Sequence, residues 1–297
     1  MFEAIIDYPV SFTFTYLSLT AECCIITALI GKIPATEFRE RTMQQELILK
    51  TKLIQTTTLL NFKVPEIDGL FPGFMSGDFA IVYGPQSVTS FVSRLCVQAQ
   101  LPKKLGGLES KVVFIDATNS SSLSDIVHAS ELQHLNLETT LVNVLCLRAY
   151  TAYRLTTLIM EKLEELVKTS GAKLVVISDI VSSFLNENLD EQEAKAVYRQ
   201  IMTYLSNFAK KHRIIVIATY LPHENYGRNI TLQEISTERA NTVLRFTKTP
   251  YTSDVELEKH QSYMLGVAEF TPETRNLTDL TNPSSKKPGA TLAYRIL

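Results

Sequence analysis

The first residues of the chain that are placed to do chemistry follow an apolar run, Phe79 to Tyr83. They read Gly-Pro-Gln-Ser-Val-Thr-Ser from Gly84 to Ser90. A loop that holds nucleotide phosphates at such a place needs glycines that expose backbone N–H groups, a lysine for the phosphate oxygens and a hydroxyl for Mg²⁺. The Gly-Pro opening fits this requirement, but the segment has no second glycine and no lysine.

When the helix after this turn is aligned with the helix that follows a phosphate-binding loop, the turn is about two residues shorter than such a loop. In that register Val88 takes the place of the lysine and Thr89 takes the place of the metal-binding hydroxyl. An ungapped alignment from Gly84 puts Ser90 at the lysine's place instead, so neither register supplies a cation. We therefore expect a degenerate nucleotide site in this turn, with the residues Gly84, Pro85, Ser87, Val88 and Thr89.

Regularly alternating elements must position this turn. Apolar runs predict strands at 79–83, 111–116, 141–146, 173–179 and 213–218. Residues 36–60 are expected to form a helix that runs into a polar connector at 55–58. Further helices are expected at 90–100, 128–135, 152–169 and 191–211. From about residue 240 the pattern changes, and three segments alternate as antiparallel strands do: 242–246, 265–270 and 290–296.

Strands that are apolar throughout and alternate with helices indicate a mostly parallel sheet with helices on both faces. The predicted fold class is therefore α/β, with antiparallel strands near the C-terminal end. In open sheets of this kind, ligands bind at the carboxyl ends of the strands. We expect a site where chain segments follow Tyr83, Ile115, Ile177 and Ala218.

Several segments resemble RecA/RadA-type recombinases, in the family's own order. The stretch from Ile67 to Pro85 is similar to the approach to their phosphate-binding loop, and 173–180 is similar to their Walker B strand. Three further segments resemble the end of the family's first core helix, its "ARAYN" strand and an edge strand: 99–102, 143–150 and 238–246. The resemblance covers roughly residues 51–270 and implies a RecA-like core of the P-loop NTPase type over 51–297, preceded by an apolar segment and linker over 1–50.

The resemblance also implies where the family's catalytic groups would fall. The Walker B acid falls at Ser178, while Asp179 comes one place late, so we expect its carboxylate on the opposite side of the strand. The catalytic glutamate falls at Thr118, and the glutamine that couples nucleotide to DNA falls at Tyr220. With the lysine missing as well, the polar groups that phosphoryl transfer needs are absent or displaced.

We therefore expect a paralog that does not hydrolyse ATP and uses neither ATP nor Mg²⁺ as a cofactor. The alternative is an ATP site rebuilt from Thr89, Asp116 and Asp179.

Two loops that hold single-stranded DNA in the recombinases have weak counterparts here. The first, Phe184 to Glu193, has four acidic residues and no Arg or Lys, so it would repel phosphate and is expected to be an acidic helix start. The second lies between Pro222 and Ile235, where Tyr226 offers a stacking contact and Arg228 a phosphate contact. An ordinary surface loop is the alternative for this second segment.

Other cations occur in three short groups, at 103–104, 210–213 and 286–287. For Lys210 and Lys211 we expect the role of stabilising the C-terminus of a helix. The formal net charge of −2 disfavours tight DNA binding by the chain alone.

Composition limits the remaining classes of function. Of the 297 residues, 45% are hydrophobic, which is enough for one large core. The four cysteines form no C-x-x-C pair and the five histidines are scattered, so we expect no metal site. The apolar stretch Pro9 to Gly31, with a half-buried strand expected at 10–16, is interpreted as a soluble packing element; a membrane or targeting segment is the alternative.

The resemblance implies an accessory interaction protein of homologous recombination and DNA repair. Its expected partner is a RadA-type recombinase or another recombinase paralog, and single-stranded DNA is a further candidate. Its expected location is with the DNA, in the cytoplasm or nucleoid, or in the nucleus of a eukaryote. Two other hypotheses are an autonomous module that binds single-stranded or junction DNA, and a regulator that retains nucleotide binding.

Overall fold

The computed structural model describes residues 59–85, 87–118, 123–185, 189–221, 223, 227–248 and 252–270. The chain divides after Thr57 into two compact units, and all of these residues belong to the second. The residues outside the described part include the apolar stretch 9–31, the helix and polar connector expected over 36–58, the lysines at 286–287 and the strand expected at 290–296.

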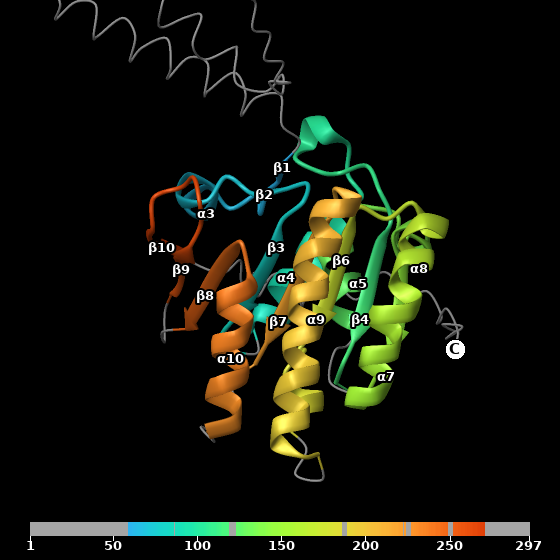
Figure 1. Ribbon diagram of the computed structural model, residues 1–297. Coiled ribbons are helices and arrows are strands. Elements are labelled where there is room, and N and C mark those ends of the chain that lie inside the picture. Colours follow the sequence, from blue (N-terminus) through green and yellow to red (C-terminus); the bar gives the residue numbers. More distant parts are fainter. Residues whose placement is uncertain are drawn as a thin grey trace, which may run out of the picture. The chain divides into compact units, whose positions relative to one another are not determined.

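An eight-stranded sheet forms the centre of the second unit (Figure 1). The strands lie in the order β10-β9-β8-β3-β7-β6-β4-β5. Their bounds are β3 (Phe79–Tyr83), β4 (Val112–Asp116), β5 (Val144–Arg148), β6 (Leu174–Ser178), β7 (Ile215–Tyr220), β8 (Thr242–Lys248), β9 (Ser253–Lys259) and β10 (Gly266–Phe270). Neighbours from β8 to β5 are parallel, whereas β9 is antiparallel to β8 and to β10. The predicted fold class is confirmed.

Helices cover both faces of this sheet. In Figure 1, α4 (Ser87–Gln98) and α5 (Leu123–Leu132) lie behind it. The helices in front are α7 (Ala152–Thr157), which continues through the π-helical segment η2 (Leu158–Lys162) into α8 (Leu163–Ser170), then α9 (Glu191–His212) and α10 (Gly227–Arg239). Because side chains alternate along a strand, Phe79 and Ile81 join the core under the front helices, and Ala80 and Val82 join the core under α4.

Short elements complete the described part. They are β1 (Leu59–Leu60), α3 (Pro65–Leu70), β2 (Phe74–Met75), η1 (Lys103–Leu105), α6 (Leu137–Val142) and η3 (Ser182–Phe184). β1 pairs antiparallel with β2, so the chain that follows the polar connector expected at 55–58 begins with a short strand. The ring of Phe62 lies 4.9 Å from that of Phe91 and 5.4 Å from that of Phe74, centroid to centroid, so this small sheet packs on the core behind β3.

The strand predicted at 141–146 is wrong in its bounds. Residues 137–142 form α6, and β5 begins only at Val144. The cause is a helix cap: the Asn136 side chain accepts a hydrogen bond from the backbone N–H of Thr139 at 3.0 Å. Strand β9 was not expected, because its charged residues alternate with the buried Val255 and Leu257 and mask its apolar face.

Candidate functional site

The turn after β3 closes within three residues, 84–86, before α4 begins at Ser87. The backbone N–H of Val88 donates to the carbonyl of Pro85 at 2.9 Å, so it is not free to bind a ligand. The Val88 side chain is fully buried (0% exposed) in the core behind the sheet, and Thr89 is buried beside it. The two residues at the lysine and hydroxyl places therefore face the protein interior.

Gly84 has a packing role that the sequence does not show. Its φ is +145°, and a Cβ built on it would lie 2.4 Å from the carbonyl oxygen of Phe246 on the neighbouring strand β8. Only glycine fits this combination of backbone angle and close approach. The requirement for glycine here therefore follows from the sheet itself, without any phosphate.

At the ends of β4 and β6, Asp116 lies in register with Ser178, and both side chains are buried. Asp116 accepts hydrogen bonds from Thr118, from the backbone N–H at 3.0 Å and from the hydroxyl at 3.4 Å. Thr118 thus lies where the resemblance implies a catalytic glutamate, and its hydroxyl turns back onto the strand end.

Asp179 follows β6 in the left-handed region, with φ of +47°. Its carboxylate is 2% exposed and lies 3.0 and 3.1 Å, through its two oxygens, from Nε2 of His223. It also accepts the backbone N–H of Leu221 at 3.2 Å, while its own N–H donates to the Thr219 hydroxyl at 3.0 Å. Because Asp179 lies beyond the strand, strand alternation does not decide its direction, and the side chain reaches toward the residues that follow β7.

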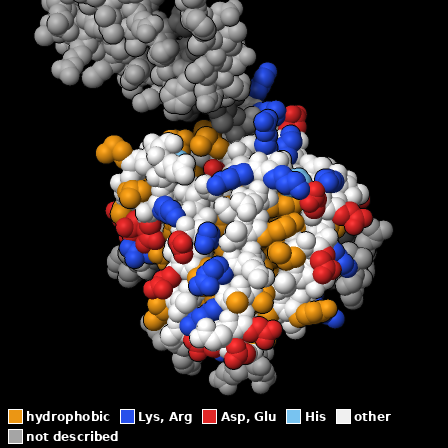
Figure 2. Space-filling view, in the orientation of Figure 1, with side chains coloured by type: hydrophobic (Ala, Val, Ile, Leu, Met, Phe, Trp, Pro, Cys, Tyr) orange, Lys and Arg blue, Asp and Glu red, His pale blue; other side chains and the backbone are white. Residues whose placement is uncertain are grey.

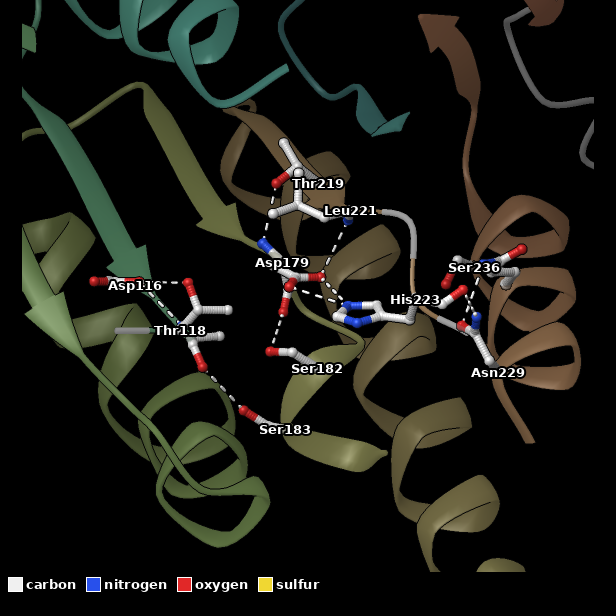
Figure 3. A network of polar contacts seen from close by, with 12 residues as sticks. Asp116, Thr118, Asp179, Ser182, Ser183, Thr219, Leu221, His223, Asn229 and Ser236 are labelled. Atoms are coloured by element: carbon white, nitrogen blue, oxygen red, sulfur yellow. Dashed lines mark hydrogen bonds and ion pairs between the residues drawn. The ribbon is translucent and has the colours of Figure 1, made fainter. Parts of the chain in front are cut away.

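The hydrogen bond to Asp179 raises the pKa of His223 above its ordinary value of 6.5, because the carboxylate stabilises the imidazolium. Figure 3 shows Asp179 and His223 pointing toward one another. Asp116 and Thr118 form a separate contact at the end of β4, which β6 separates from β7. Sequence reasoning missed His223 and Thr219. Both lie at the end of β7, where a site was expected. Asp179 precedes Thr219 by 40 positions and His223 by 44, and nothing in the sequence indicates that these residues come into contact.

Tyr220 ends β7 and stacks on Tyr83, which ends β3, with ring centroids 4.8 Å apart. The Tyr83 hydroxyl donates to Glu258 of β9 at 2.6 Å, and burial raises the pKa of both tyrosines. Both tyrosines line a cleft of about 520 Å³ between α10 and the strands, and its other lining residues are Ile230, Gln233, Glu234, Thr237, Glu238, Val243, Glu258 and Lys259. The position that the resemblance gives to a glutamine is therefore part of an aromatic pair.

The loop expected between Pro222 and Ile235 is shorter than predicted, and the DNA contact of Arg228 stays a prediction. Residues 227–239 form α10, and the Arg228 guanidinium donates to the carbonyl of Leu189 at 2.9 Å. The helix forms because Asn229, Leu232, Ile235 and Ser236 recur at helical spacing and are buried, although two of them are polar and hide the pattern. Tyr226 lies outside the described residues.

The acidic segment before α9 begins a helix, as expected. The Asp190 side chain caps α9 by accepting the backbone N–H of Glu193 at 2.9 Å, and Glu191 pairs with Lys195 at 2.6 Å.

No group of three His, Cys, Asp or Glu side chains among the described residues could hold a metal ion. None of the helices in that part of the chain is long and apolar enough to cross a membrane.

A mostly parallel sheet between two helical layers, with a strand–turn–helix unit at its centre, defines a RecA-like core. The family model for Rad51 matches residues 52–231, and the chain belongs to this family.

Three curated proteins show what the chain is similar to. It is 26% identical over 197 residues to the meiotic recombination protein DMC1 of Saccharomyces cerevisiae, a match that covers 64% of this chain and 56% of that protein. It is 31% identical over 131 residues to the DNA repair protein RAD51 homolog B of Zea mays, covering 43% of this chain and 38% of the relative. The DNA repair and recombination protein RadA of Aeropyrum pernix is 29% identical over 141 residues, 47% of this chain and 44% of that protein. The chain thus spans about half the length, or less, of these relatives.

Proposed function

We propose that this chain is a Rad51-family paralog that does not hydrolyse ATP and acts as an accessory protein in homologous recombination and DNA repair. In this proposal its working contact is with a recombinase or with a second paralog. Membership of the Rad51 family supports the proposed role in recombination and repair, and the names of the similar proteins refer to these processes.

The observation that carries the proposal is the turn between β3 and α4. A phosphate-binding loop presents a run of free N–H groups and a lysine to the nucleotide. Here the turn is three residues long, the Val88 N–H is bonded within it, and the Val88 side chain is in the core. A nucleotide would find no cation in this turn to balance its phosphates.

The other strand ends support the same reading. The alternative site built from Thr89, Asp116 and Asp179 would need all three side chains to be available to Mg²⁺. Thr89 is buried within α4, Asp116 accepts hydrogen bonds from Thr118, and Asp179 is engaged by His223. Binding a metal ion there would require these contacts to break.

The first test is a calorimetric titration of the full chain with ATP and Mg²⁺, together with an assay of phosphate release. We expect no saturable binding in the micromolar range and no turnover, because the groups that hold and activate the γ-phosphate are missing. A recombinase with an intact phosphate-binding loop is the positive control under the same conditions. Micromolar affinity with turnover would contradict the proposal.

A surface for the partner is suggested at the β10 edge of the sheet. Met264, Leu265 and Val267 lie in and just before this outer strand and are 89%, 59% and 61% exposed. Exposed apolar side chains gathered on a strand edge are typical of a surface that another protein covers.

The second test is capture of the recombinase of the same organism by the purified full chain. We expect capture by the wild type and at least about a tenfold loss with Val267→Lys, because a lysine would place a charge in an apolar contact. Val142→Lys is the matched control, since Val142 is also an exposed valine (74%) but lies at the end of α6. Failure to capture either the recombinase or a paralog would overturn the accessory role, and equal loss in both variants would move the contact away from β10.

A further inference from the structure

A second cavity lies at the other edge of the sheet, where the parallel strands begin. It has a volume of about 400 Å³ and lies among the segments that lead into β3, β6 and β7, next to η1. It is lined by Ser76, Lys103, Leu108, Val167, Lys168, Gly171, Ala172, Lys173, His212, Arg213 and Ile214, which we call the basic pocket. Asp179 and Tyr220, by contrast, lie at the carboxyl ends of their strands.

The basic pocket gathers cations from separate parts of the chain. Lys103 comes from η1, Lys168 and Lys173 flank the end of α8, and Arg213 follows α9. None of the lining residues is acidic. Lys104, Lys210 and Lys211 are exposed on the same two elements, η1 and the last turn of α9, and add to the positive charge. Figure 2 shows blue side chains gathered across the top of the described part, above α8 and α9.

Negative charge nearby is not sufficient to cancel these cations. Glu164 lies beside the pocket and is shared: its Oε1 is 2.8 Å from Nζ of Lys168, 3.4 Å from Nζ of Lys211 and 3.7 Å from Nε2 of His212. The C-terminal ends of α8 and α9 each add about half a negative elementary charge. Four lining cations and three neighbouring lysines therefore leave the pocket positive.

The fold holds two of the pocket's cations, Arg213 and Lys173, in defined places. Arg213 occupies the left-handed C-cap of α9, with φ of +52°, where glycine or asparagine is usual. Lys173 holds its place by donating from Nζ to the carbonyl of Leu108 at 3.3 Å. Neither Lys103 nor Lys173 lies in the last turn of a long helix, so the stabilisation of helix ends does not account for them.

We propose that the basic pocket binds the phosphate backbone of nucleic acid. Lysines that act as point charges around a small cavity suit phosphate groups and carry no information about base sequence. A site for an acidic peptide would be expected to offer apolar anchors, since protein interfaces are depleted in lysine and enriched in aromatic side chains. The apolar residues of the pocket do not offer them, because Leu108, Val167, Ala172 and Ile214 are all buried. The site does not depend on the loss of ATP hydrolysis or on the recombinase contact.

The test measures binding of fluorescent single-stranded and duplex oligonucleotides to the full chain by anisotropy, over a series of salt concentrations. The double variant Lys103→Glu/Lys168→Glu is expected to weaken binding by about tenfold or more at low salt. The slope of log affinity against log salt should fall by about 0.7 per lost contact on single strands and about 0.9 on duplex. The matched control is Lys162→Glu/Lys248→Glu, which changes the net charge equally at exposed positions in η2 and at the end of β8.

A specific loss in the pocket variant, with the control variant unchanged and both folded by circular dichroism, would support the proposal. Three results would overturn it: no binding of either oligonucleotide by the wild type, equal weakening by both variants, or competition by a polyglutamate peptide as effective as that by unlabelled oligonucleotide. The last result would assign the pocket to acidic peptides. Recombinase capture by the pocket variant would be unchanged in all of these cases.

Discussion

Gly84→Ala is expected to destabilise the fold by about 3 kcal/mol or more. An alanine Cβ would lie 2.4 Å from the Phe246 carbonyl oxygen and 2.8 Å from the Phe246 Cβ, so either β8 must move or the turn must open. The φ of +145° adds strain for any L side chain. Chemical denaturation followed by circular dichroism measures the change in the free energy of unfolding.

Two other glycines separate the parts of this effect. Gly171 has a positive φ of +69° and nothing within 4 Å of a built Cβ, so Gly171→Ala is expected to cost about 1–2 kcal/mol. Gly227 has neither a positive φ nor a close neighbour, and Gly227→Ala at the start of α10 should be neutral or slightly stabilising. If Gly84→Ala cost no more than Gly171→Ala, the contact with Phe246 would not be what requires glycine.

Asp179→Ala is expected to cost about 2–4 kcal/mol at pH 6. The change removes the acceptor of a charged hydrogen bond from His223 and leaves the Leu221 N–H without its partner. It also places alanine at φ of +47°, a region that Asp and Asn tolerate better than other residues. Thermal and denaturant unfolding of the wild type and the variant give the difference.

Asp179→Asn is the matched control, because asparagine keeps the size, the backbone preference and one acceptor oxygen but has no charge. The pKa of His223 is raised in the folded state, so its protonation stabilises the fold. That contribution is complete below the ordinary pKa of 6.5 and is lost as the pH rises through the raised pKa. The wild type should therefore lose stability relative to Asp179→Asn between pH 6 and pH 8. A constant difference over this range would contradict the charged pairing.

The layered fold could be predicted because its central strands are apolar along their whole length. β3, β6 and β7 are buried on both faces, so their apolar runs are continuous and set them apart from the helices. The prediction failed for segments in which the apolar residues do not mark a single element. α6 follows a polar cap at Asn136 and runs into an apolar stretch, so the two elements merge into one apparent strand.

The candidate site could be predicted only as far as local spacing carries information. The absence of a lysine after Gly84 is visible in one segment, as is the offset of Asp179 from the strand end. The contacts of Asp179 with His223, and of Tyr83 with Tyr220, join residues on separate strands whose neighbours are decided by the strand order. The basic pocket could not be predicted for the same reason, because Lys103, Lys173 and Arg213 line one cavity only when η1, β6 and α9 are packed together.

The pairing of Asp179 with His223 has a consequence for ligand binding at the carboxyl ends of β6 and β7. In open α/β sheets, ligands bind at the carboxyl ends of the strands. Here the imidazole belongs to the same folded chain as the carboxylate and is held beside it, which corresponds to an effective concentration of about millimolar or higher. A free ligand would have to compete with that internal occupant, and an anionic one would also meet the charge of Asp179.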